Sequence, residues 1–169
     1  MKLFIITGCC GSGKSTMKDA LNQLLDSDKY ACIDNDEVGL NWWDYAGTDH
    51  EYKYKDDTLA RAVEMAGGKD MVFVSCINPQ DYYTIAVVPE CIEGTYFTVL
   101  CPADEEIIRR LKARPAERGF TSDEKIMPHV EFNKWFRRNK GKFPLFIDNT
   151  NQSEAETAKL IADFVKSNT

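Results

Sequence analysis

Residues 8–15 read Gly-Cys-Cys-Gly-Ser-Gly-Lys-Ser and match the pattern G-x-x-x-x-G-K-[S/T] at every fixed position. The backbone N–H groups of such a loop can turn toward phosphate oxygens because its glycines place no side chains in the way. Lys14 can then reach the β- and γ-phosphates of a nucleotide, and the Ser15 hydroxyl can bind Mg²⁺. An apolar run before the loop and a helical pattern after it favour this interpretation over a chance glycine-rich turn. We predict that phosphates bind to Gly8, Cys9, Cys10, Gly11, Ser12, Gly13, Lys14, Ser15 and Thr16.

Two carboxylates, Asp34 and Asp36, stand two residues apart at the end of the apolar run 30–34. If this segment is extended, both side chains point the same way, and ligands of open α/β sheets bind at that edge. Phosphoryl transfer needs a carboxylate that orients or deprotonates the attacking hydroxyl, and another that serves a metal ion. An ordinary polar turn is the alternative, because Asp and Asn are favoured turn residues. Next to a phosphate loop, the functional interpretation is favoured.

The segment 109–142 contains eleven Lys and Arg residues and four Asp and Glu residues, whereas the chain as a whole has a net charge of -6. Within it, Arg110, Arg114 and Arg118 recur every fourth position, although Pro115 must end any helix before the last of them. Arginine side chains bind phosphate oxygens in a bidentate manner. We therefore predict a short basic lid at about 109–125 that closes over a nucleotide. A solvated helix surface is the alternative.

Five short apolar runs alternate with helical patterns along the chain. Each run is rich in β-branched or aromatic residues and is apolar on both faces, which is typical of strands in a parallel sheet covered on both sides. Helical spacing of apolar residues predicts helices near 17–25, 59–66, 107–111 and 158–165. The chain is expected to form one α/β domain over residues 1–169. The predicted strands are Leu3–Thr7, Tyr30–Asp34, Met71–Cys76, Tyr96–Cys101 and Pro144–Asp148.

Several residues predict where helices begin and end. Gly67 and Gly68 are typical of a helix C-terminus, and Ser153 with Glu156 forms a capping-box pattern at the start of the last helix. Thr121 with Glu124 suggests another capping box, with Pro128 interrupting the helix soon afterwards. The aromatic and basic segment 134–142 is expected to form an amphipathic helix, with a nucleic-acid patch as the alternative.

The 169-residue composition, 43% hydrophobic and 28% charged, is that of a globular protein and excludes disordered and fibrous classes. The net charge of -6 argues against a protein that coats nucleic acid. No apolar run approaches the roughly 20 residues that span a bilayer, so no membrane partner is expected. The six cysteines show no paired spacing, which favours buried thiols in a reducing compartment. We expect a cytoplasmic protein.

Together these residues resemble the P-loop kinases of small molecules, a superfamily that includes nucleoside monophosphate, shikimate and gluconate kinases, adenylylsulfate kinase and polynucleotide 5′-hydroxyl kinase. The loop Gly8–Ser15, the turn Asp34–Asp36, the arginine-rich helix and the final strand with Ile147–Thr150 occur in the superfamily's order. The resemblance covers essentially the whole chain. It implies a three-layer α/β/α fold with a five-stranded parallel sheet ordered 2-3-1-4-5, and ATP with Mg²⁺ at the site.

The resemblance also implies residue roles. By analogy with shikimate-type kinases, Asp34 would serve the metal together with Ser15, and Asp36 would face the substrate hydroxyl. The stretch 149–152 would lie near the adenine, with Asn149 binding the nucleotide. Arg110, Arg114 and Arg118 would lie in or near a short lid, with Arg110 also binding the nucleotide. The chain departs from the superfamily in three ways: no Asp ends the third strand, the triple glycine and substrate arginine of true shikimate kinases are absent, and the lid is shorter than in long-form adenylate kinases.

The expected function is ATP-dependent transfer of a phosphoryl group to a hydroxyl or phosphate of a small molecule, with a nucleoside or nucleotide favoured. Two alternatives stay open. A polynucleotide 5′-hydroxyl kinase would use the basic segment and aromatic residues to hold a strand end. A nucleotide-binding regulatory module would bind without turnover, but it has no use for the base that the Asp pair supplies. The sequence names neither the acceptor nor the oligomeric state.

Overall fold

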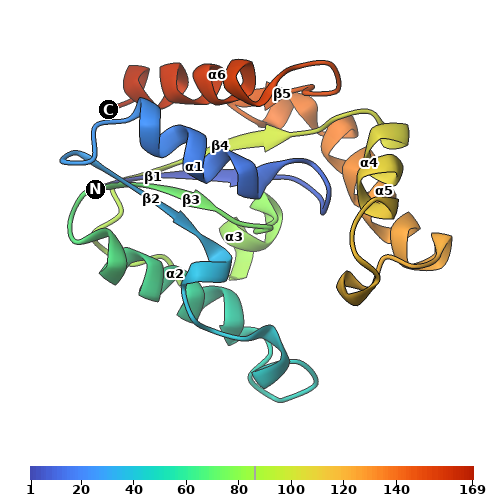
Figure 1. Ribbon diagram of the computed structural model, residues 1–169. Coiled ribbons are helices and arrows are strands. Elements are labelled where there is room, and N and C mark those ends of the chain that lie inside the picture. Colours follow the sequence, from blue (N-terminus) through green and yellow to red (C-terminus); the bar gives the residue numbers. More distant parts are fainter. Residues whose placement is uncertain (86) are drawn as a thin grey trace.

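The computed structural model of the protein describes residues 1–85 and 87–169 and contains a five-stranded sheet in the order β2-β3-β1-β4-β5 (Figure 1). All neighbouring strands are parallel, which confirms the predicted fold class and strand order. The five predicted strands all form, each within two residues of its expected bounds. The strands are β1 Lys2–Thr7, β2 Tyr30–Asp34, β3 Asp70–Val74, β4 Gly94–Leu100 and β5 Leu145–Ile147.

Helices cover both faces of this sheet, and several short 3₁₀ helices lie in the connections. None of the helices among the described residues combines the length and apolarity needed to cross a membrane. The α-helices are α1 Lys14–Leu24, α2 Lys53–Ala66, α3 Pro79–Ile85, α4 Asp104–Lys112, α5 Asp123–Arg138 and α6 Glu154–Ser167. The 3₁₀ helices are η1 Asn35–Glu37, η2 Trp42–Asp44, η3 Ala116–Arg118 and η4 Lys140–Lys142.

The central strand β1 contributes to two separate hydrophobic cores. Phe4 and Ile6 pack on the side of α1 and α6, whereas Leu3 and Ile5 pack on the side of α2. All four side chains are almost completely buried. Because successive residues of a strand face opposite sides, a strand covered on both faces must be apolar throughout. This explains why the strands read as continuous apolar runs.

Two of the expected helix ends are confirmed. Gly67 ends α2 in the left-handed conformation, with φ of 61°. The Ser153 side chain accepts a hydrogen bond from the Glu156 N–H, and the Glu156 carboxylate accepts one from the Ser153 N–H. This reciprocal capping box satisfies two N–H groups at the start of α6.

The predicted start and interruption of α5 are wrong. The N-cap of α5 is Ser122, not Thr121, and no side chain caps this end. Pro128 lies inside α5, which continues to Arg138. A proline in a helix interior costs about 3 kcal/mol, but α5 buries Val130 and Phe136 almost completely. Fully burying two such side chains contributes about 3–6 kcal/mol, which offsets the cost of the proline.

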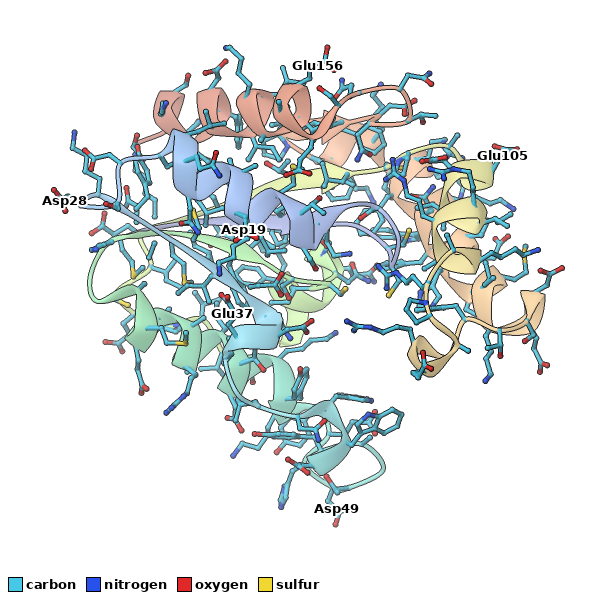
Figure 2. All side chains as sticks on the ribbon, in the orientation of Figure 1. Asp19, Asp28, Glu37, Asp49, Glu105 and Glu156 are labelled. Atoms are coloured by element: carbon cyan, nitrogen blue, oxygen red, sulfur yellow. The ribbon has the colours of Figure 1, made fainter. Side chains whose placement is uncertain are left out.

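The segment between β2 and α2 protrudes from one end of the sheet, with Asp49 near its tip (Figure 2). Tyr54 at the start of α2 makes edge-to-face contacts with Trp42 and Tyr45, at ring-centroid distances of 5.3 Å each. The Tyr45 hydroxyl donates to Asp57 at 3.0 Å. These contacts fix the protruding segment to α2.

The capping box predicts a measurable contribution to stability. Ser153→Ala removes the side-chain acceptor at the N-cap of α6 and should lower the free energy of unfolding by about 1 kcal/mol. Urea denaturation followed by circular dichroism measures this loss. Ser122→Ala is the matched control, because Ser122 occupies an N-cap without a side-chain hydrogen bond. Equal losses in the two variants would contradict the role of the Ser153 cap.

Candidate active site

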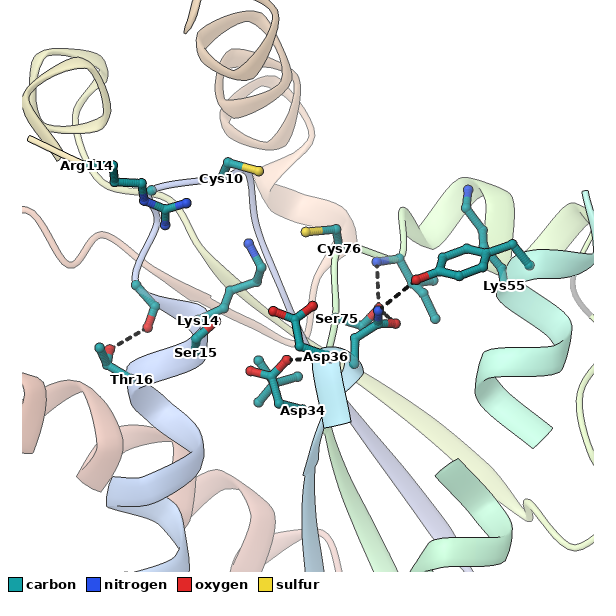
Figure 3. Close-up of a pocket in the computed structure, with 16 residues that line it drawn as sticks. Cys10, Lys14, Ser15, Thr16, Asp34, Asp36, Lys55, Ser75, Cys76 and Arg114 are labelled. Carbon is teal, nitrogen blue, oxygen red and sulfur yellow. Dashed lines mark hydrogen bonds between the residues drawn. The ribbon is translucent and has the colours of Figure 1, made fainter. Parts of the chain in front are cut away.

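Two cavities lie at the carboxyl edge of the sheet, one on each side of the loop between β1 and α1. The larger has a volume of about 380 Å³ and lies between this loop, the turn after β2, the start of α2 and the end of β3 (Figure 3). The smaller, of about 280 Å³, lies toward α4 and the residues after β5. Gly11, Gly13, Thr16 and Arg114 line both cavities. The loop predicted to hold phosphates therefore connects the two spaces.

The backbone of this loop passes where no side chain fits. A Cβ atom at Gly8, where φ is +151°, would lie 2.5 Å from the Leu100 carbonyl oxygen and 2.6 Å from the Ser12 hydroxyl. A Cβ atom at Gly11 would lie 3.2 Å from the side chain of Leu111 in α4. Because these two positions carry no side chain, the loop backbone can pass close to β4 and α4. Helix α1 then begins without a side-chain cap, which leaves its N–H groups open to an anion.

Lys14 is buried by the loop itself, with only 8% of the residue exposed. Its ammonium group donates to the carbonyl oxygens of Gly8 at 2.8 Å and Cys9 at 2.7 Å. These carbonyls compensate the desolvation of the charge. The ammonium group is therefore held inside the curve of the loop, at the wall of the larger cavity.

The smaller cavity contains a buried polar group without a partner. The Asn149 side-chain N–H group donates to the Ser12 carbonyl at 2.9 Å, while its carbonyl oxygen is buried and has no hydrogen-bond partner among the described residues. The Ser12 hydroxyl is also buried and has no hydrogen-bond partner among the described residues. Such groups are usually satisfied by water or a ligand. The Asn149 side chain, which lines the smaller cavity, therefore keeps an acceptor that no described residue satisfies.

The two predicted carboxylates line the larger cavity, but the backbone that carries them differs from the expected one. The chain leaves β2 at Asp34 and turns at once into η1, so the pair is not extended. The Asp34 carboxylate accepts a hydrogen bond from the Asp36 N–H at 3.0 Å. Both carboxylates still line the cavity with Lys14 and Ser15, and Asp36 is the more exposed of the two (Figure 3).

Glu37 and Lys18 hold this turn against α1. The Glu37 carboxylate accepts from the Asp34 N–H at 3.2 Å and is hydrogen-bonded to Lys18 of α1. The Lys18 ammonium holds the pKa of the Glu37 carboxyl below its usual range. The position of Asp34 relative to the phosphate loop is therefore fixed by α1.

A polar network that the sequence did not predict joins the turn to two other elements. The Asn35 side-chain N–H group donates to the Tyr54 hydroxyl of α2 at 3.1 Å. The Ser75 hydroxyl, just after β3, donates to the Asn35 side-chain oxygen at 3.4 Å. Tyr54, Lys55, Cys76 and Ile77 also line the larger cavity. Cys76 could have been found from its place after a strand, whereas the two helix residues carry no local signal.

The structure separates the three arginines that the sequence grouped. Arg110 donates to Glu106 at 2.6 Å and to the Gly11 carbonyl at 3.3 Å, and lines the smaller cavity. Arg114 follows α4, lies 5.4 Å from the ring centroid of Phe120, and lines both cavities. Arg118 is exposed in η3 and lines none of the cavities described. The first two arginines thus lie beside the phosphate loop and the third does not.

The two cysteines of the loop have different environments. Cys9 is 1% exposed and packs with Ile107 and Leu111, and burial raises the pKa of its thiol to about 12. Cys10 is half-buried at the cavity, and its pKa falls to about 6 because the neighbouring Cys76 thiol, and then Lys14, stabilise its thiolate. The start of α1 and Lys14 lie beside both cysteines, but only Cys10 favours the thiolate, because the burial of Cys9 outweighs their effect.

Ser15 and Asp34 fit a magnesium ion. Both line the larger cavity, and both offer oxygen atoms, which are the ligands that Mg²⁺ prefers. Magnesium in phosphoryl-transfer sites uses only one or two carboxylates, with the remaining ligands coming from water and phosphates. The donor set of this chain meets that requirement.

Comparisons with known proteins agree with this architecture. A family model described as an AAA domain matches residues 5–127, while no curated protein matches the chain. Shikimate kinase from Acinetobacter baumannii in complex with shikimate has 16% identity and a TM-score of 0.63, with 100% of this chain and 95% of that chain covered. A gluconokinase from Sinorhizobium meliloti 1021 has 18% identity and a TM-score of 0.62, with coverage of 99% and 94%. Deoxyadenosine kinase from M. mycoides with bound dATP has 16% identity and a TM-score of 0.62, with coverage of 98% and 100%.

The contrast between the loop cysteines predicts selective alkylation. Iodoacetamide should modify Cys10 and not Cys9, because the thiolate is the nucleophile and only Cys10 is accessible with a lowered pKa. The rate at Cys10 should rise through about pH 6 and level off above it, and ATP should slow it. Peptide mapping by mass spectrometry at a series of pH values measures the rate for each cysteine. Faster labelling of Cys9, or no effect of ATP, would contradict this interpretation.

Proposed function

This chain belongs to the AAA domain family and has the fold of P-loop small-molecule kinases, and we propose that it is an ATP-dependent phosphotransferase. It would transfer the γ-phosphoryl group of ATP to a hydroxyl or phosphate of a small molecule. The observation that carries the proposal is the shared cavity: the buried ammonium group of Lys14, the Ser15 hydroxyl and the Asp34–Asp36 pair all line it. Phosphoryl transfer requires these groups in one place.

The nucleotide would lie across the phosphate loop, with its base in the smaller cavity and its phosphates in the larger. Asn149 and Arg110 line the base side, and the unsatisfied oxygen of Asn149 supports this direction. The phosphates would bind the open N–H groups at the start of α1. Lys14 would then exchange its bonds to the loop carbonyls for bonds to phosphate oxygens, which are stronger because both partners are charged.

Three groups would take part in the transfer itself. Magnesium held by Ser15 and Asp34 would neutralise charge on the phosphates. Asp36 would accept the proton of the attacking hydroxyl, because it is exposed to the space where an acceptor must stand. Arg114 would stabilise the charge that develops on the transferred group. We also propose that residues 1–169 act as a single domain in the cytoplasm, with the segment 109–125 as the lid.

The acceptor side of the cavity favours a nucleoside or nucleotide. Its lining combines the aromatic ring of Tyr54, the amide of Asn35 and the amino group of Lys55. An aromatic ring binds a planar base by stacking, while amide and amino groups bind polar substituents. The structural similarity to a deoxyadenosine kinase agrees with this class of acceptor.

A polynucleotide 5′-hydroxyl kinase is the weaker candidate. Trp42 and Trp43 in the protruding segment are 38% and 78% exposed, so bases could stack on them. The segment 41–57, however, carries five Asp and Glu residues against two lysines, and a phosphate backbone requires the opposite balance. A purely regulatory nucleotide-binding module is also disfavoured, because it has no need of Asp36.

An ADP-release assay against a panel of acceptors tests the proposed function. Nucleosides, nucleotides, shikimate, gluconate and a 5′-hydroxyl oligonucleotide are each supplied with Mg-ATP. Turnover is expected with a nucleoside or nucleotide, and Lys14→Ala should abolish it, with Lys159→Ala in α6 as the control. Turnover with the oligonucleotide alone would support the second candidate. ATP binding without turnover on any acceptor would overturn the kinase proposal.

The two aspartates should respond differently to the same substitution. Asp36→Asn keeps the shape but cannot accept a proton, so kcat should fall by about 10²–10⁴ while ATP binding is retained. Asp34→Asn should instead raise the magnesium concentration needed for half-maximal rate. Magnesium titrations at saturating ATP measure both effects, and Asp19→Asn, exposed on α1, is the matched control. If Asp36→Asn changed the magnesium requirement and Asp34→Asn lowered kcat, the proposed roles of the two aspartates would be reversed. If neither variant changed the rate, neither aspartate would take part in the transfer.

The arginines of the proposed lid should also differ. Arg114→Ala should lower kcat by about 10²-fold or more, because a side chain at both cavities stabilises developing charge. Arg118→Ala should have little effect, since that side chain is exposed and lies outside the cavities described. Steady-state kinetics of the two variants compare them directly. Similar losses would mean that the segment moves further on closure than the structure indicates.

A further inference from the structure

Two cysteines from different elements line the same part of the larger cavity, with their sulfur atoms pointing toward each other (Figure 3). Cys10 belongs to the phosphate loop, and Cys76 follows β3. We propose that Cys10 and Cys76 form a reversible disulfide that closes the phosphate-binding part of the cavity. This inference rests on the proposed function, because the disulfide would regulate the site at which we propose that ATP binds.

Cys76 is held in place from both sides. The Ser75 N–H donates to the Ile6 carbonyl at 3.1 Å. On the other side, the Ile77 N–H donates to the Ser75 hydroxyl at 3.2 Å, and the Ile77 carbonyl accepts from the Thr7 hydroxyl at 2.9 Å. Cys76 is thus tied to the end of β1, the strand from which the phosphate loop starts. The short chain segments that carry the two cysteines are fixed to the same point of the sheet.

Cys9, although adjacent to Cys10, is not available as the partner. Its thiol is buried among Ile107 and Leu111, and donates to the side-chain oxygen of Asn133 at a sulfur–oxygen distance of 3.7 Å. Cys76 is exposed and lines the same cavity as Cys10. Of the two nearby thiols, only Cys76 is accessible to an oxidant and faces Cys10.

The chemistry requires a thiolate and a peroxide-class oxidant. The Cys10 thiolate attacks one oxygen of hydrogen peroxide; an S–O bond forms, the O–O bond breaks, and the departing hydroxide takes a proton to become water. The Cys76 thiol then loses its proton and attacks the Cys10 sulfenic acid. The S–S bond forms, the S–O bond breaks, and the second hydroxide leaves with that proton as water. In total, two thiols are oxidised and one peroxide is reduced to two water molecules.

Closure of this disulfide would block the nucleotide phosphates. In Figure 3 the amino group of Lys14 points toward the side of the cavity where Cys10 and Cys76 lie, and it interacts electrostatically with both thiols. A covalent bridge there would cover the ammonium group that the phosphates must reach. It would also tie the phosphate loop to the end of β3, so that the loop could no longer adjust to a ligand. Reduction by a dithiol would restore both.

Oxidation of the whole chain followed by mapping tests the inference. The protein is treated with hydrogen peroxide, free thiols are blocked, and peptides are analysed without reduction. We expect one cross-linked pair that contains Cys10 and Cys76. We also expect the Kd of a fluorescent ATP analogue to rise by about tenfold or more on oxidation, and to return after dithiothreitol. A Cys10 that stops at sulfenic or sulfinic acid, or that links to another cysteine, would overturn the inference.

Serine variants test whether Cys10 and Cys76 are the two cysteines that form the disulfide. In Cys76→Ser, peroxide should leave Cys10 as a sulfenic acid that dimedone traps, and no cross-link should form. Cys91→Ser is the control, because Cys91 is exposed and lies near Met1 at the opposite end of the sheet. In this variant the cross-link between Cys10 and Cys76 should form as in the parent protein. Each variant is compared with its own reduced form, and circular dichroism verifies folding. A disulfide that forms without loss of nucleotide binding would also reject the inference.

The same measurements distinguish this inference from the proposed function. A protein that binds the ATP analogue and loses it on forming the disulfide, but phosphorylates no acceptor, would reject the kinase proposal and support the redox site. A protein that phosphorylates an acceptor at the same rate before and after oxidation would reject the redox site and support the kinase proposal.

Discussion

The site depends on one steric constraint: the backbone of the phosphate loop lies against the end of β4, too close to it for a side chain at Gly8. At Gly8 even a methyl group would collide with the Leu100 carbonyl. In the same loop, the carbonyl groups of Gly8 and Cys9 accept hydrogen bonds from the ammonium group of Lys14, which is buried. The open N–H groups at the start of α1 then lie beside that charge. A buried cationic group beside open backbone N–H groups is the arrangement that holds a polyphosphate.

The order of the strands brings the remaining groups to this loop. Strand β1 lies between β3 and β4, and β2 lies beyond β3 with Asp34 paired to Val74. Since all the strands are parallel, their carboxyl ends meet at one edge, and the segments that follow β1, β2 and β3 share a cavity. The basic segment 109–142 then supplies Arg110 and Arg114 from the other side. Opposite charges thus meet across the loop, although the chain as a whole is acidic.

The sequence predicted the features that depend on local pattern and missed those that depend on tertiary contacts. The strands were evident because burial on both faces forces continuous apolar runs, and Lys14 and Ser15 were evident from the loop pattern; the strand order required the family resemblance. Pro128 lies inside α5 and does not interrupt it, because burial of the apolar face of the helix outweighs a local backbone preference. Tyr54 and Lys55 carry no local signal in the sequence, and only the fold brings these residues of α2 to the cavity.

The hydrophobic cluster behind the phosphate loop has a consequence for how such a site evolves. Cys9 packs with Ile107 and Leu111 of α4 and with Ile126 and Val130 of α5, in a core separate from those of the sheet. The rear of the phosphate loop is therefore supported by a small hydrophobic cluster formed with α4 and α5. Substitutions within it alter how firmly the loop is supported without touching a ligand or the main core. Selection can thus adjust nucleotide affinity through residues that no comparison of ligand contacts would identify.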